Sequence, residues 1–272
     1  VVLALLVAAT STAGNFHTDV TINFGGQRAN ISDDGLILSL TLDNYSGSGF
    51  VSNDRYLYGR FDVGMKLTAG DSAGTDTSFY LSSQGPNHDE IDFEFLGNLS
   101  GQPYALQTNV YIDGTGNREQ QIYLWFDPTQ DFHTYTILWN SYNILYLVDG
   151  TPIRVFRNYT SERVDYPSTR PMNVYASLWD ASDWATEGGK IKANYSDAPF
   201  TAYYRNYTSD GCAFEEGTNS SSCIANQTWD SLVLNSTGRS WIDWTRENYM
   251  VYNYCDDTDR FPQGLPLECS LP

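Results

Sequence analysis

The feature that most constrains this chain is the segment His88–Asn98, in which acidic and apolar residues alternate. Glu90, Asp92 and Glu94 occupy one parity, and the apolar residues between them occupy the other. A period of two is that of a β-strand, because successive side chains of a strand point to opposite faces of the sheet. The sequence therefore predicts a strand with three carboxyl groups on one face and an apolar face that can enter a core.

Three carboxyl groups on one face need a compensating role, because neighbouring like charges destabilise a sheet. Cleavage of a glycosidic bond is such a role: one carboxylic acid protonates the leaving oxygen, and one carboxylate acts from the other side of the sugar. Along a strand the Cα atoms of Glu90 and Glu94 lie ~13 Å apart, whereas a retaining mechanism places the two carboxyl groups about 5–5.5 Å apart. The two side chains would lean toward each other over Asp92, which a concave sheet favours.

Three close acids cannot all ionise easily, so we expect one of them to hold a proton near neutral pH. The alternative to a catalytic site is an acidic, exposed face on an ordinary edge strand. Residues elsewhere in the chain favour the first interpretation.

The composition points to a neutral, sugar-like partner. Of the 272 residues, 15% are aromatic and 18% are charged, and the net charge is −18. Aromatic rings stack on sugar faces, although strands favour aromatic residues in any case. The negative charge argues against nucleic acid, anionic membranes and acidic polysaccharides as partners. The three histidines show no metal-ligand spacing, so we expect neither a metal nor another cofactor.

The chain carries signs of secretion. Residues 1–13 read as the apolar core of a secretory signal peptide, and we exclude them from the fold. No later stretch is long and apolar enough for a membrane helix. Asn98, in an Asn-x-Ser acceptor close after the acidic strand, is an expected glycosylation site.

Secretion makes the four cysteines candidates for disulfides, and all of them lie in the last quarter of the chain. Three pairings are possible in principle. We expect neighbours to pair, as Cys212–Cys223 and Cys255–Cys269, so that each bond closes a short loop. Free buried thiols are the alternative.

Residues 14–207 contain many short strand-like segments separated by turn signals, without a long helical period or a repeat. This pattern predicts an all-β, two-sheet sandwich. Residues 208–272 differ in character and are predicted to form a disulfide-stapled extension packed on the sandwich, not an independent domain. The predicted strands are Gly35–Leu42, Tyr56–Leu67, Thr75–Ser82, His88–Leu96, Leu106–Tyr111, Gln120–Phe126, His133–Trp139, Ile144–Val148, Asn173–Trp179 and Phe200–Tyr207.

The acidic strand resembles the active-site signature of the plant xyloglucan endotransglucosylase/hydrolases of glycoside hydrolase family 16. The resemblance covers nearly the whole chain after residue 13. Further similar segments, in order, are Ser46–Phe50, Tyr58–Arg60, Leu81–Pro86, Gln107–Tyr111, Arg118–Gln121, Leu124–Pro128, Asp131–Tyr135, Val148–Arg154, Asp183–Thr186, Asn253–Cys255 and Arg260–Pro262. The resemblance implies a curved, concanavalin-like β-jelly-roll with an open groove across its concave face.

The resemblance also implies an activity. The enzyme would cleave the β-1,4-glucan backbone of xyloglucan with retention, through a covalent glycosyl-enzyme on Glu90. Glu94 would be the general acid and then the base, and Asp92 would orient and tune Glu90. The expected substrate-binding residues are Tyr80, Gln107, Thr108, Asn109, Asn117, Arg118, Glu119, Trp179, Trp184, Gly189 and Arg260.

Two positions depart from the family pattern. Glu187 stands where many members have Arg or Gln, and Gln107 stands where many have His. For each aromatic residue taken alone, packing in the core is the alternative to sugar binding.

The leading functional hypothesis is a transglycosylase that remodels the cell wall by joining xyloglucan chains. The absence of an obvious long insertion over Trp179–Lys190 favours transfer over the alternative, an endo-hydrolase that uses water as the acceptor. A non-catalytic glucan-binding protein is a third reading, but a binder has no need for Glu90 and Glu94. The resemblance further implies a secreted monomer of the cell wall or apoplast.

Overall fold

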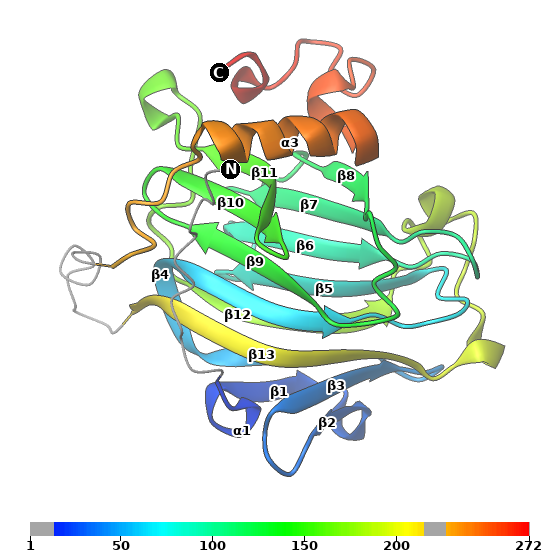
Figure 1. The fold of residues 1–272 in the computed structure, drawn as a ribbon. Helices are drawn as coiled ribbons and strands as arrows, with labels where there is room; N and C mark the ends of the chain where they lie inside the picture. The colour runs from blue at the N-terminus through cyan, green and yellow to red at the C-terminus, as the bar shows by residue number, and fades with distance from the viewer. Residues whose placement is uncertain (1–13, 215–226, 272) are drawn as a thin grey trace.

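The computed structural model describes residues 14–214 and 227–271, and strands dominate it (Figure 1). The two α-helices with described bounds are α1 (Phe16–Asp19) and α3 (Ser236–Tyr249). The strands are β1 (Val20–Phe24), β2 (Ala29–Ile31), β3 (Ile37–Leu42), β4 (Ser48–Lys66), β5 (Thr75–Ser82), β6 (Glu90–Leu96), β7 (Ala105–Tyr111), β8 (Gln120–Tyr123), β9 (His133–Trp139), β10 (Asn143–Val148), β11 (Thr151–Arg157), β12 (Met172–Asp180), β13 (Phe200–Ala213) and β14 (Met250–Asn253).

The long strand β4 belongs to both layers of the sandwich. Its first part, Ser48–Tyr56, pairs with β12 and, in part, with β1. Its second part, from Gly59 to Met65, pairs with β9, and β13 runs along the other side. Between the two parts Tyr58 has a φ of 72°, and a Cβ on Gly59 would come within 2.7 Å of the Gly211 Cα atom. A residue without a side chain is therefore required where the strand passes from one layer to the other.

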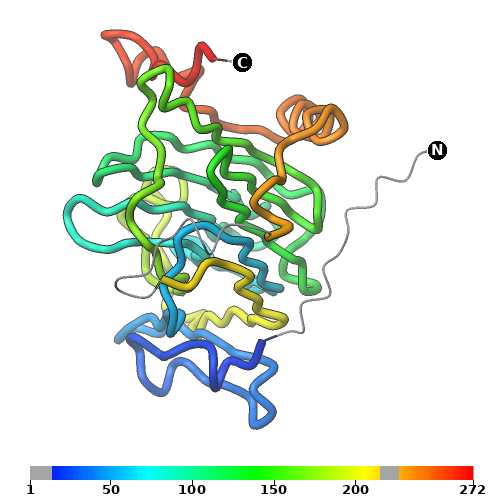
Figure 2. The backbone as a smooth tube through the Cα atoms, turned by 90° about the vertical axis from the view of Figure 1, so that its left-hand side faces the viewer, coloured from blue at the N-terminus to red at the C-terminus, as the bar shows by residue number. Residues whose placement is uncertain are grey.

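The strand order follows from this division. One layer runs β1-β4-β12-β5-β6-β7-β8-β14, and the other runs β2-β3-β13-β4-β9-β10-β11. The predicted two-sheet jelly-roll is confirmed. The elements α1 to β3 and the C-terminal elements α3 and β14 lie at opposite ends of the sandwich in both views (Figures 1 and 2).

The apolar parity of β6 forms part of the core between the layers. Ile91, Phe93 and Phe95 are fully buried. Phe93 lies 5.9 Å from the ring of Tyr135 on β9 and 5.2 Å from that of Tyr146 on β10, and Phe95 lies 4.6 Å from Tyr135, all edge-to-face. Burial of each such ring contributes roughly 1.5–3 kcal/mol. A shift of one residue in the register of β6 would place carboxyl groups in the core where these rings now lie. The packing of the core therefore determines the face on which the acids lie.

The C-terminal extension adds one strand to the edge of the sheet that contains β6. Strand β14 pairs with β8, and α3 packs against β11 (Figure 1). The predicted bond Cys255–Cys269 is confirmed, with 5.3 Å between the Cα atoms. Cys223 lies outside the described residues, so the pairing Cys212–Cys223 stays a prediction. The expected boundary after residue 207 falls inside β13, and the division into domains also stays a prediction.

Most of the predicted strands are present, two of them, β5 and β9, with the predicted bounds. Strand β4 begins eight residues earlier than expected, at Ser48, and β1, β2 and β11 are not among the predicted strands, whereas β14 lies in Trp241–Tyr254, a segment for which the sequence allows helix or strand. The aromatic-rich end of the chain is divided between α3 and β14. Within the described residues, no helix has the length and apolarity that spanning a membrane requires.

Candidate active site

Glu90, Asp92 and Glu94 lie together in one open pocket of about 330 Å³ on the face of the sheet that points away from the core. Their strand, β6, is held between β5 and β7. The other residues that line the pocket are Phe24, Asp76, Ser78, Tyr80, Tyr111, Ser177 and Trp179. The core packing of the intervening aromatic residues is what turns all three acids toward this pocket.

The register of the neighbouring strands surrounds each acid with polar or aromatic side chains of the same face. Asp92 lies opposite Tyr80 of β5 and Asn109 of β7. Tyr80 in turn stacks on Tyr175 of β12, with ring centroids 5.1 Å apart and planes 17° apart. The partners of Glu94 are Ser78 and Gln107, and those of Glu90 are Ser82 and Tyr111.

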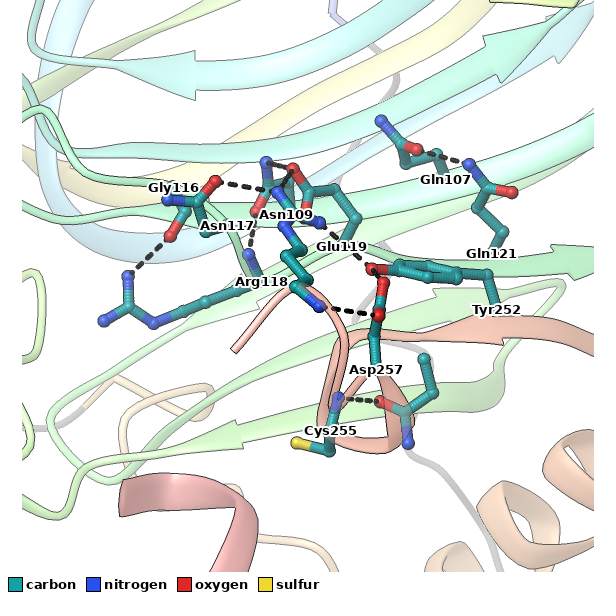
Figure 3. Close-up of polar contacts among 12 residues, drawn as sticks. Gln107, Asn109, Gly116, Asn117, Arg118, Glu119, Gln121, Tyr252, Cys255 and Asp257 are labelled. Atoms are coloured by element: carbon teal, nitrogen blue, oxygen red, sulfur yellow. Dashed lines mark hydrogen bonds and ion pairs between the residues drawn. The ribbon is translucent and has the colours of Figure 1, made fainter. Parts of the chain in front are cut away.

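Glu94 has the environment of a general acid. Gln107 Nε2 donates a hydrogen bond of 2.7 Å to Glu94 Oε2. Gln121 Nε2 in turn donates one of 2.6 Å to Gln107 Oε1 (Figure 3). Burial is the main cause that raises the pKa of Glu94 to about 7, with a further increase from the charges of Glu90 and Glu119 and an opposing effect of the Gln107 bond. The group therefore holds a proton in mildly acidic solution and can release it near neutrality.

Asp92 lies between the two glutamates and is only 4% exposed. Burial, followed by the charges of Glu90 and Glu94, raises its pKa well above the usual range. The pKa of Glu90 is also raised by burial, against the hydrogen bond from Ser82 and the charge of His88, whose Nε2 atom lies 3.8 Å from Glu90 Oε1. Burial, with mutual repulsion adding to it at Asp92 and Glu94, thus raises the pKa of all three acids and favours their protonated forms.

Asp76, a fourth carboxyl group that lines the same pocket, is not among the residues expected from the sequence. Asp76 lies on β5 and is fully buried. A signal for it exists in the chain: Asp76, Ser78, Tyr80 and Ser82 share one parity of a strand that was predicted correctly. Tyr80 is the only expected binding residue of this series, although the same alternation places all four side chains on the pocket face.

A second group of expected binding residues meets at the border between the sheet and the C-terminal extension. Arg260 donates hydrogen bonds of 2.7 Å both to Glu119 Oε2 and to Asn117 Oδ1. Asn109 Nδ2 reaches Glu119 Oε1 at 3.5 Å. Figure 3 shows Asn109, Asn117 and Glu119 gathered beside Tyr252 of the extension. These groups extend the polar surface from Glu94 across β7 and β8.

Two expected binding residues face elsewhere. Thr108 lies opposite Phe93 and therefore on the core side, where its hydroxyl accepts a hydrogen bond from buried Arg154. Arg118 is engaged by an ion pair of 2.7 Å with Glu268 and by bonds to backbone carbonyls. The structure does not bring Thr108 to the pocket, and it uses Arg118 to attach the extension. Thr108 and Gln107 are adjacent in the strand, so their side chains must point to opposite faces of the sheet, and this follows from the sequence alone.

The remaining expected residues lie near the pocket or at the end of β6. Trp179 lines the pocket, and the ring of the partly exposed Trp184 lies 6.2 Å from it. Gly189 has a φ of 81°, and a Cβ there would lie 2.2 Å from the Asp183 carbonyl oxygen, so its role is conformational. Asn98 follows the end of β6 and donates a hydrogen bond of 3.0 Å to the Pro103 carbonyl. Its glycosylation stays a prediction.

A larger cleft of about 970 Å³ lies between α3, β11 and β14. Its acidic residues include Asp256, Asp257 and Glu268, which bond to Asn253, Tyr252 and Arg118 respectively. These acids serve the packing of the extension. The pocket over β6 is therefore the candidate active site in spite of its smaller size.

Comparison with known proteins adds a family to this geometry. The model of glycosyl hydrolases family 16 matches residues 16–197, and the model of the xyloglucan endo-transglycosylase C-terminus matches residues 223–269. Putative xyloglucan endotransglucosylase/hydrolase protein 13 of Arabidopsis thaliana is 53% identical over 99% of this chain and 95% of its own length. Xyloglucan endotransglucosylase protein 1 of Diospyros kaki is 53% identical over 98% of this chain and 92% of its own length.

Solved structures show the same architecture. The β-glucanase of Bacillus licheniformis is 25% identical, with a TM-score of 0.57 over 74% of this chain and 99% of that one. A β-1,3-1,4-glucanase from a mouse hindgut metagenome is 24% identical, with a TM-score of 0.58 over 73% of this chain and 97% of that one. The second likeness concerns the fold alone.

Proposed function

The chain belongs to glycosyl hydrolase family 16, among the xyloglucan endotransglucosylase/hydrolases, and we propose that it cleaves the β-1,4-glucan backbone of xyloglucan with retention and transfers the fragment to another xyloglucan chain. The family resemblance drawn from the sequence is thus confirmed. The observation that carries the proposal is the grouping of Glu90, Asp92 and Glu94 in one pocket, with the pKa of Glu94 near 7.

Glu90 and Glu94 divide the first half of the reaction. The Glu90 carboxylate attacks the anomeric carbon of the donor, while Glu94 gives its proton to the leaving glycosidic oxygen. The bond between the anomeric carbon and this oxygen breaks, a bond from that carbon to Glu90 forms, and the released glucan end departs. Glu94 is left as a carboxylate.

The second half reverses these roles. The Glu94 carboxylate removes the proton from an acceptor hydroxyl, which attacks the anomeric carbon and displaces Glu90. Two displacements at one carbon restore its original configuration. The raised pKa of Asp92 favours its protonated form, which can donate a hydrogen bond to Glu90 and so stabilise the carboxylate as it leaves.

The polar and aromatic lining supports a neutral polysaccharide as substrate. Gln107, Asn109 and Glu119 offer hydrogen-bonding groups on one side of the acids, and Tyr80 and Trp179 offer rings on the other. The acidic pocket would repel a polyanionic chain. We propose that the protein acts as a secreted monomer in the cell wall or apoplast on xyloglucan donors and acceptors, without a cofactor and without nucleic acid or membrane partners.

Transfer and hydrolysis differ only in the acceptor that reaches the glycosyl-enzyme. The test incubates the protein with xyloglucan and a labelled xyloglucan oligosaccharide, and measures both label in polymer and new reducing ends. We expect the label to enter polymer faster than reducing ends accumulate. Cleavage without labelled polymer would identify a hydrolase, and neither signal would refute the proposed activity altogether.

Replacement of Gln107 by leucine should move the alkaline limb of the activity profile to higher pH. The Gln107 amide stabilises the charged form of Glu94, so its loss raises the pKa of that acid further. The measurement is kcat/KM against pH. Gln121→Leu is the matched control, because it removes the neighbouring amide and leaves the Gln107–Glu94 bond in place. An unchanged limb in Gln107→Leu would contradict the assigned effect.

A further inference from the structure

Asp76 is a fourth carboxyl group in the pocket for which the two-glutamate reaction has no use. It lies on β5 two residues before Ser78, which is directly opposite Glu94. On its other side it lies opposite Trp179 of β12. Asp76 is therefore the diagonal neighbour of the general acid and the direct neighbour of a ring that lines the pocket.

One oxygen atom of Asp76 receives two hydrogen bonds from the pocket wall. Trp179 Nε1 and Ser78 Oγ each donate to Asp76 Oδ2 at 3.1 Å. The carboxyl group is fully buried, whereas the Trp179 ring is only partly so. The hydrogen bond thus connects the indole N–H of the partly exposed Trp179 ring to a buried acceptor on β5.

The surroundings of Asp76 favour its uncharged form. Burial is the main cause that raises the pKa of Asp76 well above its usual range, and the charge of Glu94 adds to the effect. Among the described residues no Lys or Arg bonds to Asp76, so only the hydrogen bonds from Ser78, Trp179 and the Phe95 backbone oppose the cost of a buried charge, and burial outweighs them. The oxygen that accepts both bonds is then the carbonyl oxygen of a carboxylic acid.

We propose that Asp76 is a positioning residue that acts through Trp179: as an uncharged acceptor, it holds the indole ring in the orientation that stacks on a sugar unit of the neutral glucan. The proposal rests on the proposed function for the identity of the sugar chain. It assigns Asp76 no proton transfer and no contact with the reacting atoms. Its loss should therefore weaken substrate binding more than it slows the chemical steps.

The test compares Asp76→Asn with Asp76→Val. Asparagine keeps a carbonyl oxygen for the indole N–H. The KM of D76N should therefore stay within about twofold of that of the original protein, and its pH profile should not move. Valine removes the acceptor, and D76V should raise KM for xyloglucan about three- to tenfold, the range of one hydrogen bond, with little change in kcat. Thr77→Val is the matched control, because Thr77 is equally buried on the same strand and its side chain points to the core.

A second variant tests whether the effect passes through the ring. Trp179→Phe removes the indole N–H, so D76V should have no further effect on KM when added to W179F. The proposal is overturned if the two changes add, if D76V leaves KM unaltered, or if D76N lowers kcat more than tenfold or moves the pH profile. The last result would indicate a charged or proton-transferring Asp76.

One measurement does not depend on activity. The indole N–H resonance of Trp179, identified by its absence in W179F, should keep its position in D76N and shift in D76V. An unshifted resonance in D76V would refute the contact itself. A protein without activity on xyloglucan but with the expected resonance shifts would refute the proposed substrate and leave the positioning role of Asp76 standing.

Discussion

Replacement of Glu90 by alanine should lower the turnover of xyloglucan by a factor on the order of 10⁴ or more, the scale seen when a covalent nucleophile is removed. Alanine offers no atom that can bond to the anomeric carbon, so the glycosyl-enzyme cannot form. The polar and aromatic pocket lining remains, and xyloglucan oligosaccharides should still bind. Turnover is measured by release of reducing ends, and binding by titration calorimetry.

The control for Glu90→Ala is Glu162→Ala, which removes an exposed glutamate of a short 3₁₀ turn and should leave turnover unchanged. A chemical control is also available. Azide can enter the space that the Glu90 carboxyl group leaves and attack the anomeric carbon from the same side. The product should be a glycosyl azide of inverted configuration. Activity that survives in Glu90→Ala without azide would show that the mechanism assigned to this pocket is wrong.

Replacement of Glu94 by glutamine should have the second largest effect, a loss of about 10²–10⁴ in kcat/KM on xyloglucan, the usual contribution of a general acid. Glutamine keeps the shape of the side chain but cannot protonate the leaving oxygen. A substrate with a good leaving group, such as an aryl glycoside, needs no such proton. It should still form the glycosyl-enzyme, which should then accumulate because no base activates the acceptor. An equal loss with both kinds of substrate would contradict the assignment of Glu94.

The pH dependence follows from the same group. The original enzyme needs Glu94 protonated, so its kcat/KM should fall as pH rises through about 7, and Glu94→Gln should lack this limb. Stability should change in the same direction. Because the pKa of Glu94 is higher in the folded state, its contribution to stability is complete below the ordinary glutamate pKa of 4.5 and is lost as pH rises to about 7. Thermal unfolding should show a weaker dependence on pH over this interval in Glu94→Gln.

The sequence predicts the catalytic face well because two constraints coincide on β6. The aromatic parity must enter the core, and the acidic parity must then face the pocket, so the positions of Glu90, Asp92 and Glu94 follow from alternation alone. Thr108 is expected at the pocket only because of its position in the family pattern, whereas the alternation along β7 places its side chain on the core face. Alternation along β5 also places Asp76 on the pocket face, but a single acid in an otherwise ordinary strand does not by itself indicate a role. Only the register between β5, β6 and β12 brings it beside Glu94 and Trp179.

The bounds of β4 and the border with the extension could not be read from the chain. Strand β4 runs past its expected start because partners from distant parts of the sequence, β1 and β12, bind the segment before Tyr56. Strand β14 exists because the edge of β8 accepts it. In both cases hydrogen bonding between remote segments, and not local preference, decides the structure.

Strand β4, which both layers share, also determines how late during synthesis the two layers can be completed. Two neighbours of β4, β12 and β13, come from far downstream, so a growing polypeptide cannot complete either layer until synthesis has passed residue 213. Pairing over such separations is slow compared with local folding. The carboxyl groups of β6 therefore meet their full set of neighbours late, and a nascent chain has no complete pocket until Ser177 and Trp179 of β12 have joined it.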